Sequence, residues 1–292
     1  MDRILRGMTK DKNIRFFAVD STQTVKKAVE IHHLSITNSV IIGRMLSAAL
    51  MMSIDLKSDE NVLTLKIDCD GPIGGVIVTG NKNGFVKGYV KNPEVELPLN
   101  EETDSIDISK AIGKGTLNII KDLGLKRPYA GQVEMKYGTI AKDLTYYFVK
   151  SEQIPSSVGL GTLVMPDGSV SKAGGFIIQM MPDAPKEIIS QIEENLMHFP
   201  NLTDMMDMGH SIETLLEKFI LKDLSPEINE IKPGSYKCDC SKEKFENGLR
   251  LLSKQELQEA NENNETLTVK CHFCNTDYKF GKNEIEEIID SK

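Results

Sequence analysis

Four of the five cysteines in this chain stand in two close pairs. Cys238 and Cys240 lie in YKCDCSKEK (236–244), and Cys271 and Cys274 lie in CHFC. Because alternate residues of an extended segment point to the same side, the first pair can present two sulfurs to one ion, and a C-x-x-C turn can do the same. Four thiolates close a tetrahedral site, for which zinc is the usual metal, and leave no position for water. The spacing predicts a closed zinc site and argues against metal-assisted hydrolysis.

The role of such a site stays open between structural support and redox regulation. A segment of about 58 residues (235–292) buries too little apolar surface for a self-sufficient core, so a metal would hold it together. Zinc also keeps cysteines as thiolates, their nucleophilic form, and Lys237, Lys242 and Lys270 flank them in sequence. An oxidant that forms two disulfides would expel the metal. Structural zinc contributes about 10 to 16 kcal/mol, as much as the whole stability of a domain, so its loss should unfold the segment.

The remaining histidines and the fifth cysteine are expected to lie outside this site. His272 would be a fifth donor to a closed tetrahedron, so we do not expect it to bind metal. Cys69 falls on the apolar side of a predicted strand and is interpreted as a small core residue. His32 and His33 lie on a predicted helix, where surface or interface positions are expected. No Ser/His/Asp or Cys/His set has a spacing that supports catalysis, so the chain is not expected to be an enzyme.

Composition bounds the class of protein and its partners. The 292 residues are 40% hydrophobic and 27% charged, which fits a globular protein of about two domains. The net charge is -8 and only six of the 35 basic residues are Arg, so nucleic acid is not an expected partner. The N-terminus lacks the apolar stretch of a secretory signal, and no apolar run approaches the ~18 residues that span a bilayer. A cytosolic protein without membrane contact is expected. In the reducing cytosol, clustered cysteines are more often metal ligands or redox devices than structural disulfides.

The first 183 residues are expected to form an α+β core domain. Residues 22–53 have the pattern of two helices, and the second is apolar nearly all round, as in a buried helix. NVLTLKIDCD (61–70) alternates apolar and polar residues, as a half-buried strand does. Further short strands are predicted at 75–80, 84–90, 115–124 and 156–170, with one helix at 141–153. Consecutive strands with segregated helices favour α+β over a βαβ repeat.

The chain changes character after residue 183. Residues 186–199 and 211–220 have apolar side chains at helical spacing and predict two amphipathic helices. KPGSY (232–236) is expected to break the chain before the cysteine-rich segment. The predicted organisation is therefore a core domain (1–183), a helical linker (184–234) and a zinc-binding domain (235–292).

The linker is rich in methionine. Six of the thirteen methionines fall in or next to it: Met180, Met181, Met197, Met205, Met206 and Met208. Methionine at helical spacing usually packs in a core, but surfaces that accept many partners also use it because its side chain adapts in shape. If metal loss loosened these helices, a broad apolar surface would become available.

Taken together, these motifs resemble the 33 kDa chaperonin family, the redox-regulated heat-shock holdases of the bacterial cytosol. The resemblance rests on CDC and CHFC and covers nearly the whole chain. It runs through GRMLSAALMM, DGPIGGVIV, GYVKNPEVELP, GTLNIIKDLGLKRPYAG, YYFVKSEQIPSSVGLG and AGGFIIQ. Cys69, in DCDGP, departs from the family pattern and would add a further thiol to the oxidation chemistry.

The resemblance implies a client-binding core, a metastable linker lying on it and a zinc switch. Reduced, zinc-loaded members are inactive. Oxidation is implied to pair Cys238 with Cys240 and Cys271 with Cys274, to release zinc, to unfold switch and linker, and to promote dimerisation and binding of unfolding proteins without ATP. For this chain we expect the client-binding and linker residues to be Met197, Met205, Met206, Met208, Leu215, Leu216 and Phe219.

Two other functions compete with a holdase. A zinc-ribbon nucleic-acid binder is disfavoured because residues 235–292 carry nine Lys and Arg against twelve Asp and Glu, a net charge of -3. A thiol-disulfide oxidoreductase needs its C-x-x-C at the start of a helix, whereas TVKCHFCNTDYKF is predicted to form a hairpin with the cysteines at its tip.

Overall fold

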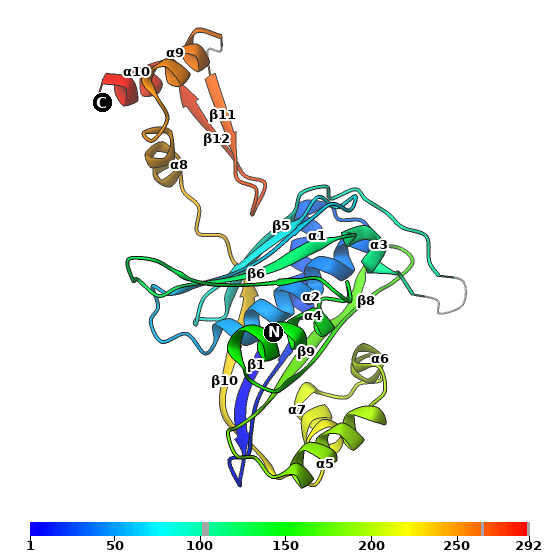
Figure 1. Ribbon diagram of the computed structural model, residues 1–292. Coiled ribbons are helices and arrows are strands. Elements are labelled where there is room, and N and C mark those ends of the chain that lie inside the picture. Colours follow the sequence, from blue (N-terminus) through cyan, green and yellow to red (C-terminus); the bar gives the residue numbers. More distant parts are fainter. Residues whose placement is uncertain (101–104, 264–265, 291–292) are drawn as a thin grey trace. The chain divides into compact units, whose positions relative to one another are not determined.

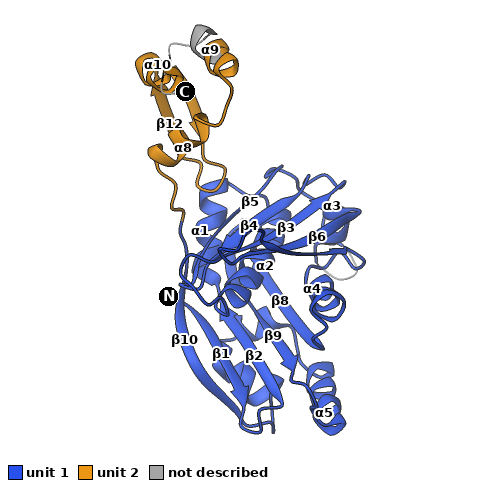
Figure 2. Cartoon of the chain, turned by 60° about the vertical axis from the view of Figure 1, so that its left-hand side comes forward, with its two compact units in different colours: residues 1–237 blue, residues 238–292 orange. Residues whose placement is uncertain are grey.

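The computed structural model describes residues 1–100, 105–263 and 266–290 and divides the chain into two compact units. Unit 1 comprises residues 1–237 and unit 2 comprises residues 238–292 (Figure 2). The α+β class is confirmed, with a large unit ahead of a small one that holds the clustered cysteines. The finer division of the first unit into core and linker stays a prediction.

Within the described residues, ten strands of unit 1 form one curled sheet in the order β7-β6-β3-β4-β5-β10-β1-β2-β9-β8. Neighbouring strands are antiparallel except β10 and β5, which are parallel. The strands are β1 (Asp2–Thr9), β2 (Ile14–Asp20), β3 (Val62–Cys69), β4 (Val76–Gly80), β5 (Phe85–Val90), β6 (Gly115–Asp122), β7 (Tyr129–Glu134), β8 (Ser156–Val164), β9 (Val170–Met180) and β10 (Pro226–Tyr236). The strands predicted at 61–70, 75–80, 84–90 and 115–124 are confirmed, and the strand predicted at 156–170 ends at Val164, before a turn to β9.

Helix α2 (Ile36–Ser53) lies between the two halves of this sheet (Figure 1). Its N-terminus is capped by Ser35, whose side chain accepts a hydrogen bond from the Asn38 N–H. It follows α1 (Thr22–His32), and both predicted helices are confirmed. By length and composition α2 is apolar enough to cross a membrane, but 89% of it is buried inside the protein. It is the core helix that the sequence predicts.

Two shorter helical segments precede β8 in the described part of the chain. They are α3 (Ile108–Ile112) and α4 (Ala141–Tyr147), which continues as the π-helix η1 (Phe148–Glu152). The helix predicted at 141–153 is confirmed. The buried carboxylate of Asp143 accepts hydrogen bonds from the N–H groups of Tyr137, Thr139 and Ile140, and so holds the start of α4.

A further group of helices covers the face of β1, β2 and β9 that points away from α2. It consists of α5 (Lys186–Met197), α6 (Leu202–Asp207) and α7 (Ile212–Leu215), which continues as the π-helix η2 (Leu216–Ile220) (Figure 1). The helices predicted at 186–199 and 211–220 are confirmed. The sheet contributes Leu5, Ile14, Phe16, Ala18, Phe176 and Ile178 to the contact, and the helical segment contributes Ile192, Leu202, Met205, Met206, Ile212, Leu215, Leu216, Ile220, Leu221 and Leu224. This helical segment is therefore docked through a core of its own.

The chain break predicted at KPGSY (232–236) is wrong. These residues end β10, which pairs with β1 from Thr9↔Pro226 to Asp2↔Gly234 and then with β5 at Ser235 and Tyr236. The strand tolerates Pro233 because its second edge is paired only from Ser235 onward. The linker segment is thus an excursion between two strands of one sheet, β9 and β10.

The end of β10 is fastened by the Tyr236 hydroxyl. It donates to the Gly88 carbonyl (2.8 Å), accepts from the Gly88 N–H (3.2 Å) and lies 3.0 Å from His32 Nε2. We expect Tyr236→Phe to lower the free energy of unfolding of unit 1 by about 1 to 3 kcal/mol, because the Gly88 groups lose their partner. Urea unfolding measures this, with the exposed Tyr137→Phe as control. Equal stability of the two variants would show that the fastening is energetically neutral.

Unit 2 is small and has a thin apolar core. It contains α8 (Lys242–Leu249), α9 (Lys254–Asn263), the hairpin strands β11 (Thr266–Lys270) and β12 (Asp277–Gly281), and α10 (Lys282–Asp290). Among its described side chains the buried apolar cluster consists of Leu249, Leu257, Phe280, Ile285 and Ile288. The predicted hairpin around CHFC is confirmed. Such a core is consistent with dependence on a metal.

Candidate metal centre

The structure brings the four predicted cysteines together. Their Sγ atoms all lie within 4.8 Å of one another. Cys238 and Cys240 come from the segment between β10 and α8, and Cys271 and Cys274 come from the turn between β11 and β12. Sγ–Sγ distances are 3.8 Å from Cys238 to Cys271 and 3.3 Å from Cys240 to Cys274. A tetrahedral zinc with Zn–S of ~2.3 Å has S–S edges of about 3.8 Å, so the donor set fits this metal.

The C-x-x-C arm is a tight turn held by its backbone. The Cys271 N–H donates to the Thr276 carbonyl (2.9 Å), and the Asn275 N–H donates to the Cys271 carbonyl (2.8 Å). Asn275 has a φ of 57°, a left-handed conformation that asparagine accepts more readily than most residues. The turn points both sulfurs to one side, as a two-ligand arm requires. None of the chain's five cysteines, all of them described, forms a disulfide in this structure.

The four thiols have unequal environments. Burial raises the pKa of the Cys238 thiol well above its ordinary value, and burial also raises the pKa of the Cys271 thiol. Burial acts in the same direction on Cys274, but its hydrogen bonds with Thr276 and with the neighbouring thiols outweigh this effect and lower the pKa of Cys274 to about 7. The C-x-x-C arm therefore holds a thiol that ionises near neutral pH, Cys274, whereas Cys238 and Cys271 need a cation to become thiolates there.

Two hydroxyl groups contact the sulfurs, and neither was predicted from the sequence. The Tyr278 hydroxyl lies 3.1 Å from Cys240 Sγ, and the Thr276 hydroxyl lies 3.2 Å from Cys274 Sγ. The bond to Cys240 raises the pKa of the Tyr278 phenol to about 12. Thr276 stands two residues after Cys274, a spacing that could have drawn attention to it. Tyr278 is recognisable only once the hairpin and the C-x-C arm are placed together.

Two of the three lysines that flank the cysteines in sequence have contacts with other groups. Lys237 Nζ lies over the Phe85 ring, 4.2 Å from its centroid. Lys242 Nζ pairs with Glu284 at 2.6 Å. These two ammonium groups therefore have partners other than the sulfurs.

The remaining predicted residues fall outside the cluster. His272 is exposed and is not part of the four-sulfur group. Cys69 lies in unit 1, half-buried against the main core, and burial raises the pKa of its thiol. A surface or interface position is predicted for both His32 and His33; His33 is exposed, whereas His32 is buried inside unit 1. His32 is 8% exposed because its side of α1 packs toward β10, where it meets Tyr236.

The predicted client-binding residues divide by exposure. Leu215 and Leu216 are fully buried, Met205 and Met206 are 8% and 3% exposed, and Phe219 is half-buried. In contrast, Met197 and Met208 are 79% and 76% exposed. The structure thus separates residues that dock the helical segment from residues that already face solvent. A role of either group in client binding stays a prediction.

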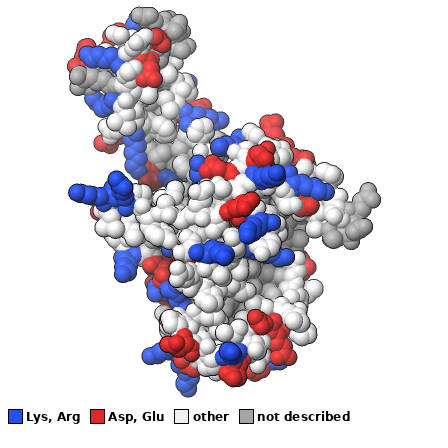
Figure 3. Space-filling view, viewed as in Figure 1, with Lys and Arg blue, Asp and Glu red and all other residues white. Residues whose placement is uncertain are grey.

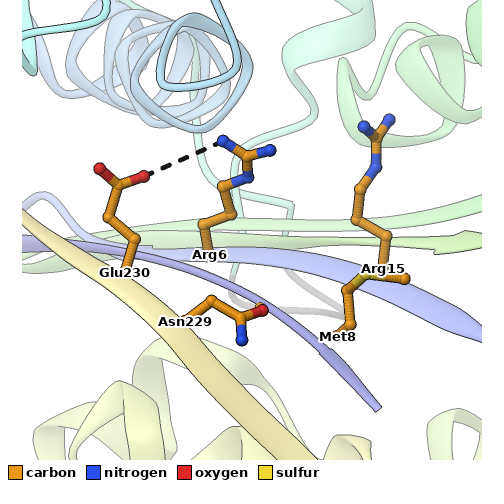
Figure 4. A pocket seen from close by; sticks show the side chains of 6 residues that line it. Arg6, Met8, Arg15, Asn229 and Glu230 are labelled. Carbon is orange, nitrogen blue, oxygen red and sulfur yellow. Dashed lines mark ion pairs between the residues drawn. The ribbon is translucent and has the colours of Figure 1, made fainter. Parts of the chain in front are cut away.

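Unit 1 also contains a cavity of about 340 Å³. It is lined by Arg6, Gly7, Met8, Arg15, Asn229 and Glu230 (Figure 4). Arg6 pairs with Asp55 (3.1 Å). It also approaches Glu230 (4.0 Å), and the dashed line in Figure 4 marks this second pair. Arg15 also pairs with Asp55 (3.1 Å) and binds Gln179. Because both guanidinium groups already have partners in the chain, the cavity presents no unpaired charge to an anion.

Comparison with known proteins points in the same direction as the cysteine cluster. Residues 2–281 match the protein family described as Hsp33 protein. The 33 kDa chaperonin of Agathobacter rectalis is 45% identical over 287 residues, covering 98% of this chain and 99% of that protein. The 33 kDa chaperonin of Bacillus pumilus is 42% identical over 289 residues, covering 99% and 98%. The crystal structure of the 33 kDa chaperonin (heat shock protein 33 homolog) from Thermotoga maritima superposes with a TM-score of 0.89 at 37% identity, over 99% of this chain and 98% of that one.

Proposed function

The chain belongs to the Hsp33 family, and on this premise we propose that it is a redox-regulated, ATP-independent holdase of the cytosol. Its activity is to bind unfolding proteins and keep them from aggregating during oxidative stress, and we expect no catalytic turnover. The observation that carries the proposal is the cluster of four sulfurs within 4.8 Å, in a unit whose described apolar core has five buried side chains. A unit of this kind folds or unfolds with the state of its cysteines.

In the inactive state, Cys238, Cys240, Cys271 and Cys274 would hold zinc, which would keep all four sulfurs as thiolates. Activation by a peroxide begins when one thiolate attacks an oxygen and becomes a sulfenic acid, with release of hydroxide. A second thiolate then attacks that sulfur, a disulfide forms and a second hydroxide leaves. Each disulfide consumes one peroxide and two electrons of the thiolate pair. Two disulfides remove all four donors.

The pairing implied by the family is Cys238 with Cys240 and Cys271 with Cys274. The two measured Sγ–Sγ distances, 3.8 Å and 3.3 Å, join sulfurs of different arms. In a tetrahedral cluster every sulfur is near every other, so distance does not select a pairing. We retain the pairing within each arm as the one that the family implies.

The helical segment is proposed to mask the client-binding surface. Besides its apolar contact with the sheet, it is tied by Arg3–Glu213 (2.9 Å) and Ser171–Asp207 (2.5 Å). These polar contacts are few and partly exposed, so they add little to the docking energy. Release of the segment would uncover apolar side chains on the sheet and on the helices at once. Such a large exposed apolar surface binds non-native proteins and favours self-association, so the proposal includes dimerisation of the oxidised form.

Strand β10 is the covalent route between the cysteines and this segment. Its first residue, Pro226, follows the helices, and its last residue, Tyr236, stands two positions before Cys238. We propose that unfolding of unit 2 weakens the short pairing of β10 with β5 and, through the strand, the docking of the helices. This refines the expectation that the zinc-binding segment braces the linker.

The competing functions have less support. Cys271 and Cys274 lie in a hairpin turn rather than at a helix N-terminus, the usual setting of a dithiol catalyst. On the face drawn in Figure 3, basic and acidic side chains are interspersed, without the continuous basic surface that binds a phosphate backbone. No nucleic acid or membrane is included among the proposed partners.

We expect the reduced protein to contain one zinc and to leave the aggregation of a chemically denatured client unchanged. After peroxide treatment it should lose the zinc and suppress aggregation without ATP, and a reductant with zinc should reverse both changes. Light scattering of the client and metal analysis of the same samples test this. Suppression that is equal before and after treatment would rule out redox control, and turnover of a disulfide substrate would favour the oxidoreductase.

A further inference from the structure

The cysteine cluster has unequal neighbours, and one contact crosses between its two arms. Cys240 belongs to the C-x-C arm, whereas Tyr278 belongs to β12, on the hairpin that carries the C-x-x-C arm. Their side chains meet at 3.1 Å between hydroxyl oxygen and Sγ. The hydroxyl of Thr276, in contrast, contacts Cys274 of its own arm at 3.2 Å. Tyr278, which lies on the hairpin, is therefore placed to influence how Cys240 of the C-x-C arm is held in the cluster.

The position of the Tyr278 hydroxyl is set by its ring. The ring lies against Phe245 of α8, with 4.8 Å between ring centroids and 31° between ring planes. Its backbone is paired with Val269 across the hairpin. Strand pairing and ring packing together leave the hydroxyl little freedom, so the fold of unit 2 fixes its contact with Cys240.

The direction of this hydrogen bond follows from the chemistry of a thiolate ligand. A thiolate has no hydrogen to donate, so the phenol must donate to Cys240 Sγ whenever that sulfur is ionised. Such a bond stabilises the negative sulfur and withdraws charge from it, which weakens its attack on an oxidant. Removal of a hydrogen-bond partner of a metal ligand typically lowers metal affinity 10- to 100-fold.

We propose that Tyr278 is a positioning residue of the redox switch, whose hydroxyl holds Cys240 Sγ in the donor set and slows the oxidation of the C-x-C arm. The inference rests on the proposed function and adds a residue that sets how readily peroxide activates the switch. The affected step is the attack of the Cys240 thiolate on peroxide, which gives a sulfenic acid and hydroxide. The Cys238 thiolate then attacks the sulfenic sulfur, the disulfide forms and a second hydroxide leaves.

Tyr278→Phe tests this, because it keeps the ring on Phe245 and removes only the hydroxyl. With a fixed excess of hydrogen peroxide and a chromogenic chelator, we expect zinc to leave the variant about tenfold faster than the wild type and to bind about tenfold more weakly. In the cobalt-substituted protein the thiolate-to-metal charge-transfer band should move to longer wavelength, because a thiolate without its hydrogen bond is more easily oxidised. Phe245→Leu loosens the ring but retains the hydroxyl, so it should shift the release rate and the affinity in the same direction by less than Tyr278→Phe does.

A second variant keeps the test decisive if Tyr278→Phe fails to fold. Incorporation of 3-fluorotyrosine at position 278 retains ring and hydroxyl but makes the hydroxyl a stronger donor, so zinc release should become slower than in the wild type. Unchanged release rates and an unchanged cobalt spectrum would overturn the role of Tyr278. If the wild type itself binds no zinc, or keeps it in peroxide, the proposed function fails instead, so the two failures are distinguishable.

Discussion

A protein with Leu215→Asn and Leu216→Asn is expected to hold clients while it is still reduced and zinc-loaded. Both leucines are fully buried in the contact between the helical segment and the sheet. Truncation of a buried leucine costs about 2 to 5 kcal/mol, and an unsatisfied buried amide adds to this. The two substitutions together should remove more than about 5 kcal/mol of the docking energy, which the few polar ties of the segment cannot replace. The segment should therefore leave the sheet without any oxidation.

Three measurements on the reduced protein follow this release. Light scattering should show suppressed client aggregation, an apolar dye should gain fluorescence, and amide exchange should increase across 186–220 while α2 stays protected. Met197→Gln with Met208→Gln is the matched control, because it also replaces two apolar side chains of the segment, but at positions 79% and 76% exposed. If the leucine variant stays inactive until oxidised, docking of the segment is not what masks the client-binding surface.

The parts of the fold that follow one simple periodicity could be predicted from the sequence. β3 alternates Leu63, Leu65 and Ile67 toward the core, and α2 is apolar on all sides because both halves of the sheet cover it. β2 follows neither pattern. Phe17 faces the main core, while Phe16 and Ala18 face the helical segment, so residues 16–19 form a continuous apolar run without alternation.

β10 escaped prediction for a different reason. Its register shifts opposite Arg6 and Gly7, so that Asn229 is an extra residue and the spacing of Ile228 and Ile231 no longer follows a period of two. Pro233 then gives the appearance of a break. The parallel pairing of its end with β5 joins residues about 150 positions apart, and no local pattern records such a contact.

The candidate site shows the same contrast. The two cysteine arms have a spacing that reflects the geometry of one tetrahedral ion, so the cluster could be predicted from local sequence alone. The contact of Tyr278 with Cys240 depends on the relative placement of α8 and the hairpin. Because the tertiary packing of unit 2 sets this placement, no spacing along the chain indicates the contact.

Loss of one metal ligand is expected to unfold unit 2 while unit 1 stays folded. Cys271→Ser replaces a buried thiolate donor, and the remaining three sulfurs would hold zinc far more weakly. Metal binding supplies about 10 to 16 kcal/mol to sites of this kind, more than the thin core of unit 2 can replace. Amide exchange should therefore lose protection across 238–290 in the variant, as it should in wild-type protein treated with a strong chelator.

Cys69→Ser is the matched control for this variant, because it removes a thiol that lies in unit 1, outside the cluster. It should bind zinc as the wild type does. Unchanged zinc affinity of Cys271→Ser would contradict the four-ligand assignment. The same exchange data also test the route through β10. If unit 2 loses protection and the helices at 186–220 lose part of theirs, with Ser235 and Tyr236 exchanging first, the strand transmits the loss. If the helices stay fully protected, metal release and client binding are separate events, and a second oxidation-dependent step must undock the helical segment.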